Sequence, residues 1–198
     1  MMASTFSRTA ALAAAAIANQ IAAVTFMIPI AIAQASTVRV GNFAGAADRA
    51  NLSRSAGATF WIGIAATAAT MAILLIWPEF LIGLFLTGKD AMFAEVMALA
   101  LPMLLLTALF QIPDGVQAIA MSVLRGVNDT RIPAIVAITS FWISGVAVGA
   151  LAGFSLGFGP TGVWGGLLLG LSVASLILTM RMMRAMRRIC NGGRILLA

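Results

Sequence analysis

The sequence contains no histidine, no tyrosine and a single cysteine, Cys190. Without histidine and with one isolated cysteine, it offers neither a Cys/His metal cluster nor a Ser/His or Cys/His catalytic dyad. One cysteine also cannot form an intrachain disulfide, so it does not indicate an oxidising compartment. We therefore expect neither an enzymatic activity nor a cofactor.

Charged residues are also scarce. They make up 9% of the chain, whereas 62% of the residues are hydrophobic and the mean hydropathy is +1.05. So few polar residues cannot cover the surface of a soluble globule of 198 residues. The composition predicts an all-α integral membrane protein whose first partner is the lipid bilayer.

The charges delimit the membrane spans, because a helix needs about 20 nearly uncharged residues to cross the hydrocarbon. Arg8 and Arg39 enclose 30 uncharged residues, enough for one helix. The 49 uncharged residues between Arg131 and Arg181 fit two helices joined by a tight turn. We predict one transmembrane domain over residues 1–198, a five-helix bundle with a basic tail at 182–198. The spans are placed near residues 10–35, 57–78, 96–124, 131–154 and 161–181.

Ten of the twelve basic residues fall on one side of this topology. Because Arg and Lys accumulate in short cytoplasmic loops, the C-terminus is expected in the cytoplasm and the N-terminus outside. The net charge of +6 then fits a positive-inside anchor without any nucleic-acid partner, and the basic tail could also touch anionic lipid. An outside N-terminus without a basic signal-peptide region suggests a missing upstream segment.

Asp114 lies in the interior of the third span, about eleven residues before the next charge, Arg125. At about 1.5 Å rise per residue its carboxylate lies roughly 16 Å from that end, near the midplane of a bilayer about 30 Å thick. An ionised aspartate there costs roughly 2.5 to 3.5 kcal/mol. We interpret Asp114 as a cation-binding residue, with Na⁺ as the metal ion considered; the alternative is an acid satisfied by a neighbouring helix.

The residues beside Asp114 predict a kinked or unwound helix, because Pro113 removes a backbone donor and Gly115 loosens the next turn. Broken helices at this depth are typical of binding sites in secondary transporters. Polar and aromatic side chains three or four residues from the acid share its helix face, where they could line the site or hydrogen-bond between helices. These side chains are Phe110, Gln111 and Gln117.

The first span contains a milder version of this pattern, with Pro29 and the adjacent amides Asn19 and Gln20. The amides could line a cavity or hydrogen-bond to another helix. Glycine recurs every four residues in the last two spans, which predicts close backbone packing rather than chemistry. These glycines are Gly145, Gly149, Gly153 and Gly157 in the fourth span and Gly162, Gly166 and Gly170 in the fifth.

Three loop motifs follow one another along the chain, at residues 38–48, at 111–117 continued by 124–133, and at 159–166. In this order they resemble the motifs of the MATE family, the multidrug and toxic compound extrusion transporters. The match covers nearly the whole chain. The loop residues that carry it include Arg39, Gly41, Gly45, Arg125, Gly126 and Asp129.

Family members usually have twelve helices in two six-helix lobes. The five spans resemble helices eight to twelve, most of the C-terminal lobe, so the missing upstream helix would be helix seven. The resemblance implies efflux of small cationic or amphipathic drugs across the bacterial inner membrane by antiport with Na⁺ or H⁺. In NorM-like members the acid matching Asp114 takes part in cation binding. Phe110 stands where a tyrosine is often found, and Asn19-Gln20 where the family often has His-Gln.

One five-helix piece cannot supply both walls of an alternating-access pore. The resemblance therefore implies an N-terminal lobe as partner or a homo-oligomer. A truncated fragment that does not transport is the alternative, as is a half-transporter that needs a partner lobe. A lipid-linked glycan flippase of the same superfamily is a further alternative, but we would expect more basic residues within its spans.

Overall fold

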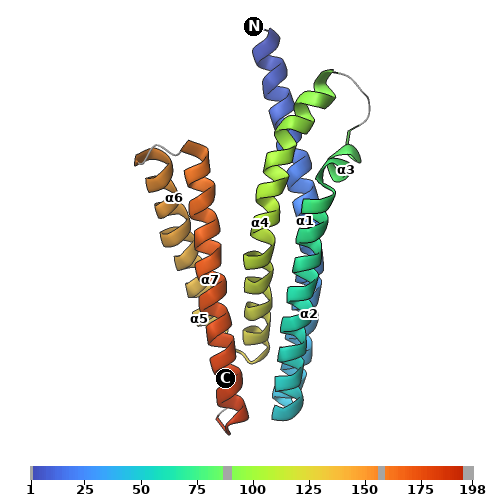
Figure 1. The fold of residues 1–198 in the computed structure, drawn as a ribbon. Coiled ribbons are helices and arrows are strands. Elements are labelled where there is room, and N and C mark those ends of the chain that lie inside the picture. Colours follow the sequence, from blue (N-terminus) through green and yellow to red (C-terminus); the bar gives the residue numbers. More distant parts are fainter. Residues whose placement is uncertain (1, 87–90, 156–158, 194–198) are drawn as a thin grey trace. The chain divides into compact units, whose positions relative to one another are not determined.

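The computed structural model describes residues 2–86, 91–155 and 159–193. Every regular element within these ranges is a helix. Long apolar segments favour this outcome in a membrane, because a helix satisfies its backbone hydrogen bonds within one segment. The predicted all-α membrane fold is confirmed (Figure 1).

The elements differ widely in length, from the 44 residues of the first helix to the 3 residues of a single turn in the fourth span. The short α3 begins at a proline, the residue favoured at the first position of a helix. In chain order the elements are α1 (Met2–Gly45), α2 (Arg49–Ile76), α3 (Pro78–Gly83), α4 (Ala91–Gly126), α5 (Arg131–Thr139), η1 (Ser140–Ala147), α6 (Val148–Ala150), η2 (Leu151–Ser155) and α7 (Gly159–Cys190).

Five segments of the described ranges are long and apolar enough to cross a membrane, which confirms the predicted number of spans. Several helices extend beyond the predicted bounds; the first continues to Gly45 and the second already begins at Arg49. Hydropathy marks only the part suited to hydrocarbon, whereas backbone hydrogen bonding continues into the polar ends. The segments are Thr9–Gly45, Arg49–Ile76, Phe93–Gly126, Arg131–Gly153 and Trp164–Cys190.

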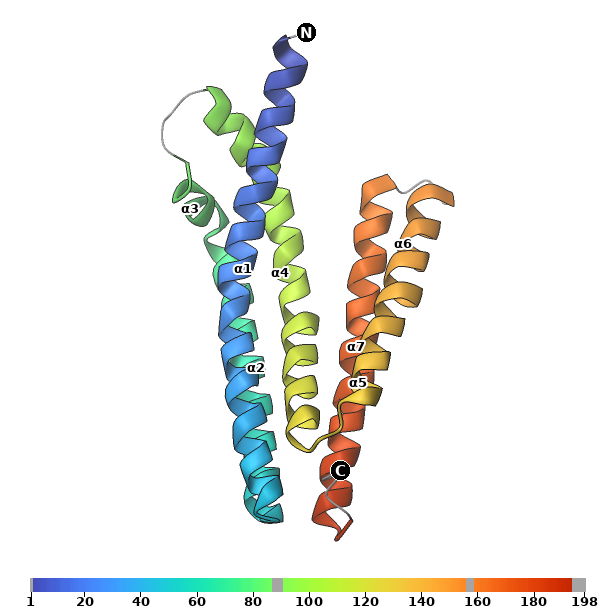
Figure 2. The same ribbon diagram turned by 180° about the vertical axis from the view of Figure 1, so that it is seen from behind.

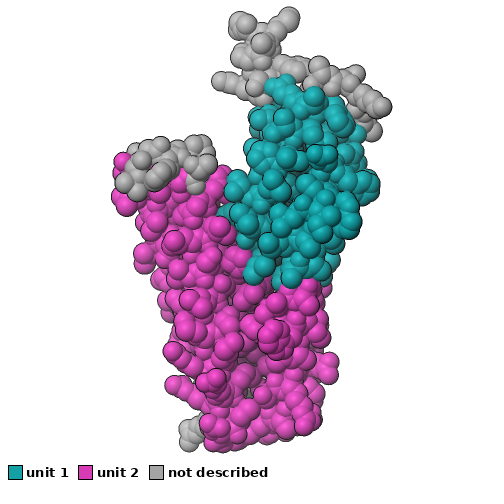
Figure 3. All heavy atoms as spheres, in the orientation of Figure 1, with its two compact units in different colours: residues 1–28, 67–112 teal, residues 29–66, 113–198 magenta. Residues whose placement is uncertain are grey.

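The chain divides into two compact units, which Figure 3 colours separately. Unit 1 comprises Met1–Ile28 and Thr67–Ile112, and unit 2 comprises Pro29–Ala66 and Pro113–Ala198. Helices α1, α2 and α4 therefore contribute residues to both units, whereas α7 belongs to unit 2 alone. Two of the boundaries fall directly before a proline, one in α1 and one in α4.

Each unit has its own hydrophobic core. The core of unit 1 is built largely from small and aliphatic residues: Ala10, Ala14, Ile21, Leu74, Ile82, Val96, Ala100, Leu104 and Ala108. The core of unit 2 joins α1, α2, α4 and α7 through completely buried side chains such as Val40, Leu52, Leu124 and Leu178. The second core holds the last part of α7 against the ends of the other three helices.

The fourth and fifth spans form an antiparallel pair within unit 2, which Figure 2 shows from behind. A Cβ atom placed on Gly170 would lie 2.7 Å from the Cα atom of Gly145, closer than side chains tolerate. Backbone therefore meets backbone, and the predicted glycine packing is confirmed, except that Gly157 lies outside the described residues. The facing pairs are Gly145 with Gly170, Gly149 with Gly166, and Gly153 with Gly162.

The fourth span is not a regular α-helix. Its residues Ser140–Ala147 and Leu151–Ser155 form π-helix, separated by the single α-turn α6. Long π-helical segments are rare in proteins. Hydropathy cannot distinguish a π-turn from an α-turn, so the sequence predicted only a helix over this span.

Candidate functional site

Helix α4 carries Asp114, which is half-buried and belongs to unit 2. The helix is α-helical from Ala91 to Gly126 and so does not unwind beside the acid. Pro113 lacks an N–H group, but membrane helices tolerate this loss where neighbouring groups re-satisfy the freed carbonyl. A bend at Pro113 and Gly115 stays a prediction.

Gln117 lies one turn after Asp114, also in unit 2. Its Oε1 atom is buried and accepts no hydrogen bond from the described residues. An unsatisfied buried polar group costs about 1 to 3 kcal/mol, so such a group calls for an explanation. An anionic and a neutral oxygen donor three residues apart on one helix are the ligand types that hard cations take.

Gln111 has a different environment in unit 1. Its side chain is buried, and its Nε2 atom donates a hydrogen bond of 2.8 Å to the hydroxyl of Thr25 on α1. The hydroxyl in turn donates to the carbonyl of Ile21 at 2.9 Å. Gln111 therefore takes part in an interhelical hydrogen bond, the alternative that the sequence left open. Thr25 was missed because a threonine in an apolar helix usually bonds only its own backbone.

Asn19 and Gln20 are exposed on the part of α1 that belongs to unit 1, and Phe110 is half-buried on α4. In the part of the chain that the structure describes, neither amide forms a hydrogen bond with Gln111. Their assignment as cavity-lining residues stays a prediction.

The loop motifs at the ends of α1 and α4 meet within unit 2. A Cβ atom on Gly126 would lie 2.9 Å from the Cβ of Val40 and 3.1 Å from the carbonyl oxygen of Thr37. A Cβ atom on Gly41 would lie 3.5 Å from the carbonyl oxygen of Gly126, so the two helices approach closely there. The Thr37 hydroxyl also donates to the carbonyl of Ser122 at 3.2 Å. These motif glycines thus have a packing role.

The remaining motif residues do not share this role. Arg39 and Arg125 are exposed, and a Cβ atom on Gly45 would meet nothing within 4 Å. Asp48, at the end of the first motif, caps α2 by accepting hydrogen bonds from the backbone N–H and the side-chain amide of Asn51. These two bonds hold the pKa of Asp48 below its usual value.

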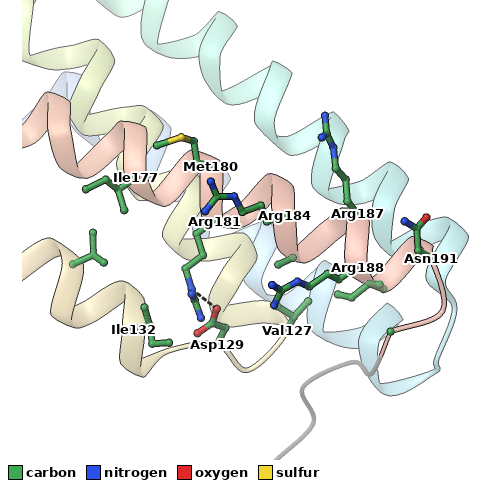
Figure 4. Close-up of a pocket in the computed structure, with 14 residues that line it drawn as sticks. Val127, Asp129, Ile132, Ile177, Met180, Arg181, Arg184, Arg187, Arg188 and Asn191 are labelled. Atoms are coloured by element: carbon green, nitrogen blue, oxygen red, sulfur yellow. Dashed lines mark hydrogen bonds and ion pairs between the residues drawn. The ribbon is translucent and has the colours of Figure 1, made fainter.

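Asp129 of the second motif forms an ion pair with Arg181, whose Nε donates to its Oδ2 at 2.7 Å (Figure 4). Only 8% of the Asp129 side chain is exposed, against 31% for Arg181. The pair joins residues 52 positions apart, which no motif spacing could predict. It borders a cavity of about 700 Å³ in unit 2, lined by Val127, Asp129, Ile132, Val136, Ile177, Met180, Arg181, Arg184, Ala185, Arg187, Arg188, Ile189, Asn191 and Gly193.

Among the described residues, no three or more His, Cys, Asp or Glu side chains gather where they could hold a metal ion. A cation at Asp114 would therefore be bound by one carboxylate together with amide, hydroxyl or backbone oxygens. Oxygen ligands of this kind suit hard cations better than the metals that prefer thiolate or imidazole ligands.

Comparison with known proteins supplies the family context. The family model described as MatE matches residues 1–151. "Probable multidrug resistance protein NorM" of Rhizobium meliloti (strain 1021) is 42% identical over 178 residues, covering 90% of this chain and 38% of the relative. The chain therefore spans well under half the length of this relative.

Two solved structures share the fold. One is described as "Crystal structure of eukaryotic MATE transporter AtDTX14", with a TM-score of 0.74 at 19% identity over 93% of this chain and 41% of the other. The second is an "Inward-facing conformation of a multidrug resistance MATE family transporter of the MOP superfamily", with a TM-score of 0.71 at 15% identity over 94% and 44%. Both are described as transporters and neither as an enzyme.

Proposed function

The chain belongs to the MatE family, and from this premise we propose that it forms part of a secondary active exporter of small cationic or amphipathic compounds. The export is coupled to inward movement of Na⁺ or H⁺ through Asp114. The observation that carries the proposal is the half-buried carboxylate inside a membrane span, one turn from the unsatisfied oxygen of Gln117.

The coupling follows from the charge of the site. Binding of Na⁺ or a proton neutralises the carboxylate and removes most of the roughly 2.5 to 3.5 kcal/mol that an ionised aspartate costs at this depth. The bound and free states of α4 then differ in stability, so ion binding shifts the population between two conformations. A cationic substrate would compete for the same negative charge, and its release would follow ion binding.

We expect the chain to pair with a second lobe for this export. The relative "Probable multidrug resistance protein NorM" is more than twice as long as the matched region, which favours a half-transporter that pairs with an N-terminal lobe or with a second copy. The relative from Rhizobium meliloti is bacterial, which supports the inner membrane as the location. The arginine distribution supports a cytoplasmic C-terminus.

Efflux of a fluorescent cationic dye tests the proposal in cells that co-express the chain and a matching N-terminal lobe. Asp114→Asn removes the exchangeable charge and should abolish gradient-driven efflux while the protein remains inserted. Glu79→Gln is the matched control, because Glu79 is an exposed acid in α3, outside the membrane spans. Normal efflux by the Asp114→Asn variant would refute the coupling role.

Expression of the chain without the N-terminal lobe distinguishes a homo-oligomer from a half-transporter. Dye efflux by the chain alone, lost in Asp114→Asn, would support a homo-oligomer. Efflux only with the added lobe would support a half-transporter, and no efflux in either case would identify a fragment that does not transport.

A further inference from the structure

We propose that the cavity beside the Asp129–Arg181 ion pair binds the headgroup of an anionic phospholipid. The cavity lies wholly in unit 2, between the α4–α5 connection and the last turns of α7. Its volume of about 700 Å³ is large enough for a phosphate group and the start of an acyl chain. The site is separate from Asp114, and its occupation does not depend on the proposed export.

The charge of the lining favours an anion. Four arginines border the cavity, against a single acid, Asp129. Arg181, Arg184 and Arg188 follow one another at three- and four-residue intervals, so they lie on one face of α7. Figure 4 shows Arg188 directed toward the side of the cavity where Asp129 lies, whereas Arg187 points away from it. Arg181 uses its Nε atom on Asp129 and keeps its two terminal nitrogens for a further acceptor.

These arginines are not needed to cap the end of α7. The Gly193 amide donates to the carbonyl of Arg188 at 2.8 Å, and the Gly192 amide donates to that of Ile189 at 3.3 Å. With Gly192 at a φ of +90°, this is a Schellman arrangement that satisfies the last carbonyls with backbone amides. The guanidinium groups of Arg184 and Arg188 therefore remain available for a ligand.

The other side of the cavity is apolar. Ile132 and Val136 come from α5, and Ile177 and Met180 come from α7, all within segments apolar enough to span a membrane. Ile132, Ile177 and Met180 also remain exposed, so this wall continues to the lipid-facing surface. A small soluble anion would use only the arginine side. A phospholipid uses both, because its phosphate meets the arginines and its acyl chain follows the apolar wall.

Native mass spectrometry of the purified chain tests the inference in micelles that contain either phosphatidylglycerol or phosphatidylcholine. Phosphatidylglycerol should stay bound in preference to phosphatidylcholine. The double variant Arg184→Gln/Arg188→Gln should weaken its retention by about tenfold or more. Each basic side chain near an anionic membrane surface strengthens lipid binding by up to about tenfold. Arg39→Gln/Arg54→Gln is the matched control, since it removes two exposed arginines that do not line the cavity.

Four results would overturn the proposal. Equal retention of the two lipids would show that the cavity does not distinguish their headgroup charges. Full displacement by inorganic phosphate alone would identify a small-anion site, and equal loss in the control variant would show a general effect of charge. Circular dichroism checks that both double variants keep their helix content. Retention should persist when an N-terminal lobe is co-purified, and its loss would identify the cavity as a lobe interface.

Discussion

At the scale of single residues, the buried polar groups described above fall into two kinds. Gln111 is satisfied by Thr25, and Asp129 is satisfied by Arg181. Gln117 leaves a buried oxygen without a donor among the described residues. The first kind stabilises the fold. The second kind is the one on which a binding site can be built, because a ligand restores what the protein leaves unsatisfied.

The Thr25–Gln111 hydrogen bond gives a prediction at this scale. Thr25→Val removes the acceptor and leaves the buried Nε2 group of Gln111 without it, so the free energy of unfolding should fall by about 1 kcal/mol. Chemical denaturation of the purified chain in detergent, followed by circular dichroism, measures the change.

A matched control isolates the interhelical bond. The Thr107 hydroxyl donates to the carbonyl of Met103, four residues earlier on its own helix, and to no other group of the described residues, so Thr107→Val should change stability much less. The double variant Thr25→Val/Gln111→Leu should recover part of the loss, because neither partner is then left unsatisfied. Equal effects of Thr25→Val and Thr107→Val would contradict the prediction.

Some of these residues could be selected from the sequence, but their interaction partners could not. Asp114 and Gln117 could be selected as candidates because an acid and an amide are rare inside an apolar run. The partner of Asp129 could not, since the ion pair depends on how α7 packs against the end of α4. Nor could the bond to Thr25 be predicted, because spacing along one helix does not say which side chain of another helix lies opposite.

At the scale of elements, the five spans were predictable because uncharged runs encode their length and number. The glycine spacing also predicted which faces meet in the last two spans. The π-helical turns and the unbroken α4 helix were not predicted. Both depend on backbone hydrogen bonding, which hydropathy does not record.

The contact between Gly149 and Gly166 predicts that substitutions at the adjacent positions 165 and 166 differ strongly in their effect on stability. A Cβ atom on Gly166 would collide with the backbone of Gly149 and lie 2.8 Å from the carbonyl oxygen of Gly145. A Cβ atom on Gly165 would meet nothing within 4 Å. Gly166→Ala should therefore destabilise the pair by about 1 to 3 kcal/mol, as overpacking does, whereas Gly165→Ala should have little effect. Thermal unfolding of the two variants in the same detergent compares them, and equal midpoints would contradict the packing described above.

At the scale of the whole molecule, the proposed orientation can be tested without adding any label site. Cys190 is the single cysteine of the chain, and it is exposed at the end of α7. If the C-terminus is cytoplasmic, a membrane-impermeant maleimide should not react with Cys190 in intact cells but should react in inverted membrane vesicles. Cys190→Ser is the control for background labelling. Labelling in intact cells would place this end outside and reverse the predicted topology.

Family membership was predictable at this scale, since three loop motifs in a fixed order are more specific than any single residue. The division into two units was not. The boundary between the units divides α1 before Pro29 and α4 before Pro113, although hydropathy treats each helix as continuous.

The backbone contact between the glycine pairs has a genetic consequence. A substitution at Gly166 cannot be rescued by trimming its neighbour, because the facing residue, Gly149, has no side chain to shorten. Gly63 differs, since the three atoms nearest to a Cβ placed there all belong to the side chain of Ile119, and a smaller residue at 119 could make room. A search for second-site suppressors should therefore recover changes at 119 for Gly63 variants and none within the facing helix for Gly166 variants.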